Sequence, residues 1–251
     1  MKRIVLAVVL NLIFCTTALA NQAANRETLY QGSTIEALLA GNYDGVADVK
    51  MIKEQGDMGL GTFTGLDGEM IVLDGKVYKA AKDGKVTLEK DNMQTPFYAV
   101  TFFDADKTQK LTSQGFSIET LRAELDKLRP RNYLPYAIII KGSFSMVKVR
   151  SVGPYPEPYP LLSEAVADQN VIEHTALPGR LVGFWMPSYM GNANAAGYHL
   201  HFLSDDCQKG GHVLALAVND VEVYLDETPN MHIGFSPYPT KPLPAPDSYK
   251  A

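Results

Sequence analysis

A short proline-rich segment near the middle of the sequence limits how this chain can fold. Four of the seven residues from Pro154 to Pro160 are proline. Proline has no backbone N–H to donate to a neighbouring strand, so a central β-strand cannot continue through this segment. We therefore expect a crossover or a domain boundary here, with an N-terminal domain at residues 21–153 and a C-terminal domain at residues 154–251.

The first twenty residues have the features of a secretory signal peptide. A basic start is followed by an apolar run over residues 4–14 and by small residues in Ala18-Leu19-Ala20, the pattern that signal peptidase reads. The apolar run is shorter than the roughly 20 residues that a membrane span needs. We therefore assign residues 1–20 to a signal peptide and expect an exported mature chain, periplasmic or extracellular, with no membrane attachment after cleavage.

The composition of the remaining chain favours a packed globular protein and makes several kinds of partner poor candidates. It would keep one cysteine, Cys207, so its stability must come from a hydrophobic core rather than from internal disulfides. The full sequence has 23 Lys and Arg against 28 Asp and Glu, and it contains no basic cluster. Nucleic acid and anionic membranes are therefore poor candidates as partners.

Sequence patterns predict a mixed order of helices and strands. Helices are expected after the capping box Ser33-Thr34-Ile35-Glu36, between Ser117 and Pro130, and over residues 162–173. The expected strands are residues 69–73 and 77–78 around the Asp74-Gly75 turn, then 97–103, 136–140, 146–152, 180–185, 198–203 and 212–225. This order indicates an α/β protein of mixed α+β type, with mixed sheets flanked by helices, rather than a regular βαβ repeat.

Three of the five histidines fall within one short stretch of the expected second sheet. His199 and His201 alternate along a strand, so both imidazoles project from the same face. A loop ending in Gly210-Gly211 can return the chain and place His212 on the neighbouring strand. Three imidazoles with an open fourth position are typical of a catalytic zinc site, so we expect Zn²⁺ on the C-terminal sheet. The alternatives are ordinary sheet histidines or a weak surface metal site, and Cys207 is a competing ligand or a plain exposed thiol.

Four segments of the sequence resemble the α-acetolactate decarboxylase family. They are Gly61-Thr-Phe-Thr-Gly-Leu-Asp-Gly-Glu69, Lys148-Val-Arg-Ser-Val152, Pro178-Gly-Arg-Leu-Val-Gly-Phe-Trp185 with Pro187, and Gly197-Tyr-His-Leu-His-Phe-Leu203 leading to Gly210-Gly-His212. The resemblance extends from about residue 29 to about residue 235. It implies a homodimeric zinc lyase with two-domain subunits that converts the small keto acid 2-acetolactate to acetoin and carbon dioxide.

The resemblance also implies roles for individual residues. His199, His201 and His212 would be the zinc ligands, and Arg150 would contact the substrate carboxylate through two parallel hydrogen bonds. Glu69 and Thr62 would be polar groups of the active site, with Glu69 as proton donor or relay. From the residues alone, Glu69 could instead be an exposed strand-start residue, and Arg150 could form a surface charge cluster with Lys148.

The end of the sequence departs from the family pattern. The family is expected to bring a further glutamate into the site from its C-terminal tail, whereas the sequence after Phe235 contains no glutamate and Asp247 is its only acid. Two alternatives to acetolactate decarboxylase therefore stay open. One is a zinc lyase of the same fold for a related 2-hydroxy-3-keto acid, and the other is a noncatalytic exported module that binds zinc or a small acid.

Overall fold

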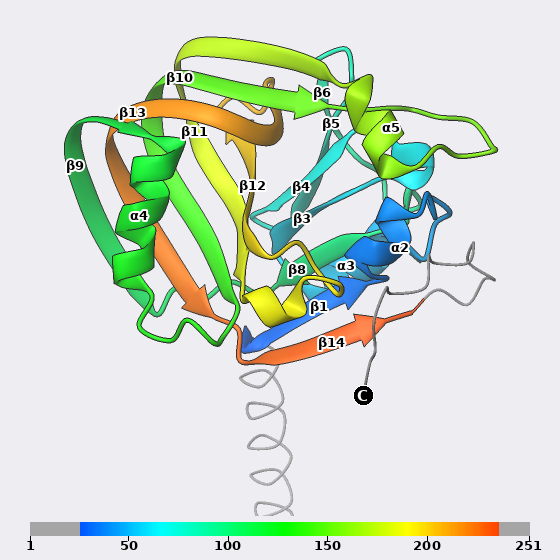
Figure 1. Cartoon of the computed structure of the whole chain (residues 1–251), viewed down its shortest axis with the longest axis horizontal. Helices are drawn as coiled ribbons and strands as arrows, with labels where there is room; N and C mark the ends of the chain where they lie inside the picture. The colour runs from blue at the N-terminus through cyan, green and yellow to red at the C-terminus, as the bar shows by residue number, and fades with distance from the viewer. Residues whose placement is uncertain (1–25, 236–251) are drawn as a thin grey trace, which may run out of the picture.

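A computed structural model describes residues 26–235 of the chain as a mixed α+β fold built on two large sheets (Figure 1). The predicted fold class is confirmed. The proposed signal peptide at residues 1–20 and the proline-rich tail from residue 236 lie outside the described residues. Within the described part, no helix is both long and apolar enough to cross a bilayer.

The first sheet has seven strands and is formed mainly by the first hundred residues. Its strands, in spatial order, are β14 (Asn230–Gly234), β1 (Thr28–Gly32), β8 (Tyr98–Thr101), β3 (Met58–Thr62), β4 (Glu69–Leu73), β5 (Lys76–Ala80) and β6 (Val86–Leu88). The strand from near the end of the chain, β14, pairs in parallel with β1. The two ends of the described chain therefore lie side by side (Figure 1).

The second sheet has five strands, several of them long and strongly bent. In spatial order they are β10 (Tyr136–Ser151), β11 (Asn170–Met186), β12 (Gly197–Ser204), β13 (Gly210–Glu227) and β9 (Lys107–Ser117). β10 also pairs with β13, so these two strands and the two between them close into a ring. Shifts of register along the β10–β13 pair mark bulges, which let strands of this length bend.

Short helices pack around the two sheets. They are α2 (Ile35–Leu39), α3 (Val49–Gln55), α4 (Ile118–Leu128) and α5 (Leu162–Ala167), with 3₁₀ turns at Thr64–Leu66 and Ser188–Met190 and a short strand pair of β2 (Ala47–Asp48) and β7 (Gln94–Thr95). α4 packs against the five-stranded sheet, as Figure 1 shows. α2 and α5 lie together on the opposite side of the molecule.

Several local predictions are confirmed. The hairpin at Asp74-Gly75 joins β4 and β5, and both turn residues have positive φ, as a two-residue type I′ turn requires. The helix expected after Ser117 spans Ile118–Leu128, is capped by Ser117 in a capping box with Thr120, and buries Leu121 and Leu125. Its apolar positions recur every three to four residues, which places them on the face that packs on the sheet.

Other local predictions are wrong or incomplete. The helix expected over residues 162–173 ends at Ala167, and the chain is already a strand from Asn170, since the side chains of that segment alternate in burial as on a strand. The first helix is capped by Thr34 rather than Ser33, because Ser33 has a positive φ of 64° and Thr34 accepts the bond from the Ala37 amide. The strands expected at 136–140 and 146–152 are one strand, β10.

The two sheets do not divide at the proline-rich segment. β9 and β10 precede residue 154 and belong to the five-stranded sheet, while β14 follows it and belongs to the seven-stranded sheet. The segment leads from β10 to α5 and β11, which agrees with the expected crossover. A division into two domains at residues 153 and 154 stays a prediction.

Candidate metal centre

Strand register alone gathers three histidines and one arginine on one face of the five-stranded sheet. His201 on β12 lies opposite His212 on β13, and His212 lies opposite Arg150 on β10. Residues directly opposite on antiparallel strands share a face, as do residues two apart on one strand. His199 therefore joins the same group, with His212 on the strand between those of His201 and Arg150.

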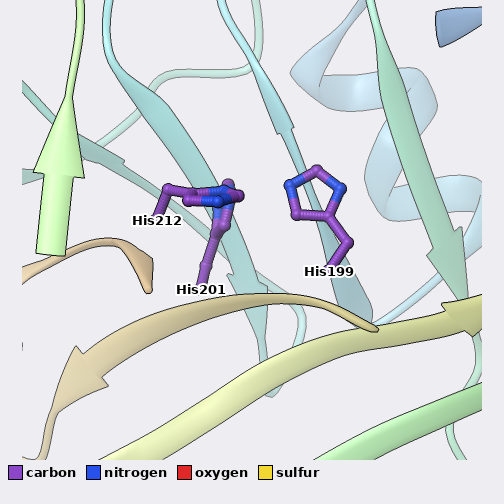
Figure 2. Close-up of side chains that lie close together, drawn as sticks. All are labelled: His199, His201 and His212. Atoms are coloured by element: carbon purple, nitrogen blue, oxygen red, sulfur yellow. The ribbon is translucent and has the colours of Figure 1, made fainter. Parts of the chain in front are cut away.

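The three imidazoles form a compact triangle. One ring nitrogen from each of His199, His201 and His212 lies within 4.8 Å of the others, and their ring centroids are 4.9–5.3 Å apart. Figure 2 shows the three rings gathered together, with His199 approaching from the side opposite to His201 and His212. Since His201 is 0% exposed, a surface metal site does not describe this cluster.

Each ring presents a buried nitrogen that the described residues leave without a hydrogen bond. These atoms are His199 Nδ1, His201 Nε2 and His212 Nδ1. His201 Nδ1 lies 2.8 Å from the Met70 carbonyl oxygen. Because a carbonyl oxygen can only accept, His201 must carry its proton on Nδ1, which leaves a lone pair on Nε2. Unpaired buried polar atoms are costly, and three of them at one point fit a site for a metal ion.

The surroundings keep all three rings neutral. Burial and, to a smaller extent, the positive charge of Arg150 lower the pKa of His199 to about 4. Burial likewise holds the pKa of His201 and of His212 well below the usual range, with a smaller contribution from His199. Metal binding requires the neutral imidazole, so these rings need lose no proton to become ligands near neutral pH.

The seven-stranded sheet adds a carboxyl group and a hydroxyl group to the same site. Thr62 on β3 lies opposite Glu69 on β4, and both residues are buried. Glu69 Oε1 accepts a hydrogen bond from Arg150 Nη1 at 3.1 Å, and Glu69 Oε2 lies 3.4 Å from His201 Nε2. The site therefore lies where the two sheets face each other.

Glu69 is held between opposing electrostatic effects. Burial raises the pKa of its carboxyl group, and the neighbouring Arg150 guanidinium lowers it to a smaller extent. Its Oε2 faces the lone pair of the neutral His201 ring, and two such atoms repel unless a proton or a cation lies near them. This arrangement is a second local feature that fits a metal ion beside Glu69, or a Glu69 carboxyl that carries a proton.

Thr62 has a restricted hydrogen-bonding role. Its hydroxyl donates to the Gly68 carbonyl oxygen at 2.7 Å, so its proton is already in use and the hydroxyl oxygen remains as an acceptor. Gly68 closes the turn between β3 and β4 with a φ of 86°, and an added Cβ would lie 2.6 Å from the Ala80 carbonyl oxygen. The glycine therefore lets the turn pack tightly and fixes the direction of the Thr62 side chain.

A cavity of about 200 Å³ opens beside the histidines. Its polar lining includes Thr62, Glu69, Arg150, His199 and His212. Its apolar lining, which we call the apolar wall, comes from Ile35, Leu38, Leu66, Phe97, Val152, Leu162 and Ala195, with the aromatic Tyr198 and with Gly61 beside it. A small molecule with one charged end and one alkyl end matches this division.

The structure brings together all six residues that the sequence singled out. Arg150 is not at the surface: its side chain is 16% exposed and bonds Glu69, whereas Lys148 is 40% exposed and pairs with Glu173. Cys207 is a free thiol in the turn before β13 and does not belong to the histidine cluster. Asp247 lies outside the described residues.

Sequence reasoning did not find the apolar wall or the carbonyl that orients His201. Most of the apolar residues come from α2, α5, the 3₁₀ turn at Thr64–Leu66 and the positions just before β8 and just after β10, and each has the sequence character of an ordinary core position. Met70 acts through its backbone, so no residue type could have indicated it. In the sequence, the only signal near that carbonyl was Glu69 at the start of a predicted strand.

Comparisons with known proteins indicate one family. The profile of the family described as "Alpha-acetolactate decarboxylase" matches residues 29–240. An alpha-acetolactate decarboxylase of Methanosarcina mazei is 44% identical over 202 residues, which cover 80% of this chain and 70% of that protein. The Bacillus subtilis protein of the same name is 37% identical over 205 residues, covering 82% of this chain and 80% of its own.

Solved structures show the same fold. The crystal structure of alpha-acetolactate decarboxylase from Bacillus subtilis strain 168 superposes with a TM-score of 0.82 at 36% identity, covering 84% of this chain and 90% of that one. A Staphylococcus aureus protein described as similar to alpha-acetolactate decarboxylase superposes with a TM-score of 0.80 at 32% identity, covering 83% and 89%.

Proposed function

This chain belongs to the alpha-acetolactate decarboxylase family, a family of carboxy-lyases, and we propose that it converts 2-acetolactate to acetoin and carbon dioxide with a zinc ion held by His199, His201 and His212. The observation that carries the proposal is the meeting of three buried, unpaired imidazole nitrogens at a cavity that also contains Arg150 and Glu69. Three neutral nitrogen ligands with an open position are typical of catalytic zinc.

The reaction breaks the bond between the carboxylate carbon and the carbon that carries the hydroxyl group. The electron pair of that bond moves toward the adjacent keto oxygen, and a bound zinc ion would supply Lewis-acid stabilisation of the negative charge there. The carboxylate leaves as carbon dioxide. The remaining enediolate must then accept a proton at carbon to give acetoin.

Arg150 binds and orients the carboxylate in this proposal. Its side chain comes from β10 and belongs to the polar lining of the cavity, and one terminal nitrogen is already fixed by Glu69. The planar guanidinium can present a further pair of donors to the substrate carboxylate, a geometry that lysine lacks. The apolar wall accommodates the methyl groups and excludes water from the reacting carbons.

Glu69 and Thr62 complete the proposed chemistry. Burial raises the pKa of the Glu69 carboxyl group and so favours its protonated form, which can deliver a proton to the enediolate carbon. The Thr62 hydroxyl donates to Gly68, so toward the substrate it acts as an acceptor and orients the hydroxyl group of acetolactate. The hydrogen bond that Arg150 Nη1 donates to Glu69 Oε1 fixes the direction of the Glu69 carboxyl group.

The proposal is tested by incubating the purified protein with racemic acetolactate and measuring acetoin and zinc content, with and without a chelator. Acetoin formation that the chelator abolishes and added zinc restores is the expected result. His212→Ala is expected to lose both zinc and activity, because it removes a ligand. Arg150→Ala is expected to keep zinc and lose activity, because it removes only the carboxylate contact.

Each alternative gives a different result. Turnover of a related 2-hydroxy-3-keto acid in preference to acetolactate would favour the lyase with a different substrate, and zinc binding without carbon dioxide release would favour the noncatalytic module. Equal loss of zinc in both variants would contradict the division of roles between His212 and Arg150. Export and a homodimeric state stay predictions.

A further inference from the structure

Two buried amide side chains, Gln31 and Asn194, form a fully enclosed contact beside the candidate site. Gln31 is 1% exposed and Asn194 is 2% exposed. Asn194 Nδ2 donates to Gln31 Oε1 at 2.6 Å. Gln31 Nε2 donates to the carbonyl oxygens of Ser33 and Ala193, both at 2.7 Å. We call this pair of side chains the amide clasp.

The amide clasp joins three segments that surround the cavity. Gln31 belongs to β1, Ser33 lies just before α2, and Ala193 and Asn194 lie in the connection between β11 and β12 (Figure 1). The backbone follows the same path, because the amide of Ile35 at the start of α2 donates to the Ala193 carbonyl oxygen at 3.0 Å. That oxygen therefore receives one bond from the clasp and one from α2.

The amide clasp holds two residues of the apolar wall, Ile35 and Ala195, in place. Ile35 lines the cavity and is bonded to Ala193 through its backbone, and Ala195 lines it directly after Asn194. Asn194 Oδ1 also accepts from the Ala195 amide at 2.7 Å. The histidines are held differently, since His201 and His212 are paired with each other across two sheet strands.

From this arrangement, we propose that the amide clasp is a positioning element that sets the width of the apolar side of the cavity and so determines which 2-alkyl substituent the substrate can carry. The proposal rests on the proposed decarboxylase function. Neither clasp residue touches the substrate: each acts through Ile35 and Ala195. If the clasp is loosened, α2 and the β11–β12 connection can move away from the candidate metal site. The three histidines would keep their positions.

A shift of the apolar wall affects most directly how well the enzyme distinguishes substrates with alkyl groups of different size. One methylene in an apolar pocket changes catalytic specificity by roughly tenfold or more, because a wall in contact with the substrate has no room for another carbon. A wall that has moved back loses contact with the methyl group of acetolactate and accepts an ethyl group in its place. A role limited to folding stability would leave this ratio unchanged.

The test compares Gln31→Glu with the unmodified protein on acetolactate and on its homologue with ethyl in place of methyl at C2. Glutamate keeps the acceptor for Asn194 but cannot donate to Ser33 and Ala193. The expected result is a KM for acetolactate raised about threefold or more and a preference for methyl over ethyl reduced by roughly tenfold, with zinc content unchanged. Gln109→Glu, on exposed β9, is the matched control and should change neither value.

A variant that lowers the thermal midpoint but keeps the unmodified KM and the unmodified preference would overturn the proposal. If Gln31→Glu does not fold, Asn194→Asp undergoes the same measurements, since it removes only the donor to Gln31 Oε1. Failure of both variants to fold would show that the pair serves the fold rather than the cavity, and would also overturn it. Absence of acetoin with the unmodified protein would instead contradict the proposed function.

Discussion

At the scale of single residues, the geometry of the histidine triangle depends on a position without a side chain. Gly183 on β11 lies opposite Leu200 on β12, between the strand positions of His199 and His201. A Cβ at Gly183 would lie 2.0 Å from the His199 carbonyl oxygen, and that atom belongs to the backbone and cannot rotate away. The close approach of the two strands at Gly183 therefore helps to fix the position of the His199 backbone.

We predict that Gly183→Ala weakens metal binding more than it weakens the fold. The added methyl group must push β12 away from β11 and carry His199 with it, and a ligand displaced by a few tenths of an ångström no longer meets the other two. Zinc content after dialysis should fall well below that of the unmodified protein. Gly234→Ala is the control, because its Cβ would meet only the Gln31 carbonyl oxygen at 3.8 Å. Equal zinc retention in both variants would contradict the prediction.

At the scale of elements, α4 is held to the sheet by a buried arginine among aromatic rings. The Arg129 guanidinium stacks over Trp185 at 3.5 Å from the ring centroid. It also donates to the Tyr198 hydroxyl at 3.1 Å and pairs with Asp126. Tyr198 directly precedes His199, so this contact connects the end of α4 to the start of the ligand-bearing strand.

We predict that Arg129→Lys lowers the free energy of unfolding by about 1–2 kcal/mol, because lysine loses the planar stacking and the forked donors. Arg131→Lys, at a side chain that is 55% exposed, should change it by less than about 0.5 kcal/mol. Chemical denaturation of both variants measures the difference. Comparable effects at the two positions would show that the aromatic contact adds no stability.

The elements that could be predicted are those whose pattern is local. α4 has a capping box and a regular apolar face, and the β4–β5 hairpin has a turn that only a few sequences adopt. β9 was not predicted, because its eleven residues are mostly polar and exposed and it is a strand only by pairing with β13. The end of α5 was also missed, since the long β11 that follows is set by pairing with β10.

At the scale of the whole molecule, the site depends on packing that no local pattern contains. The histidine triangle could be predicted, because strand alternation and one glycine turn are enough to place it. The approach of Glu69 to Arg150 could not be derived from spacing, since it joins residues 81 positions apart on different sheets. Family resemblance supplied those two residues, and the facing of the sheets explains why they meet.

A buried acid near the end of β13, Asp226, makes a second contact between distant parts of the chain. Its side chain is buried, and Oδ2 accepts from the Asp104 amide at 3.1 Å. Its pKa is raised to about 8, mainly by burial and also by the nearby carboxylates of Asp106, Glu27 and Asp104, while the hydrogen bond from the Asp104 amide acts in the opposite direction. Glu27 lies at the start of the described chain, and Asp104 and Asp106 lie in the connection before β9.

The sign of the pH dependence follows from the protonated state of this carboxyl group. An unfolded aspartate loses its proton near pH 4, whereas Asp226 in the folded protein holds it to about pH 8. Its contribution to stability is therefore complete below about pH 4 and is lost as the pH rises toward 8. Asp226→Asn cannot ionise and still offers an oxygen to the Asp104 amide, so it escapes this loss.

We predict that Asp226→Asn is more stable than the unmodified protein at pH 9, by on the order of 2–3 kcal/mol, and similar to it near pH 4. Urea denaturation across this range measures the difference, with Asp205→Asn on an exposed turn as the control. The gain should appear progressively between about pH 4 and pH 8, because that is the interval in which only the unfolded chain is ionised at this position. A variant that is less stable than the unmodified protein at pH 9 would show instead that the ionised carboxylate stabilises the junction of the two sheets.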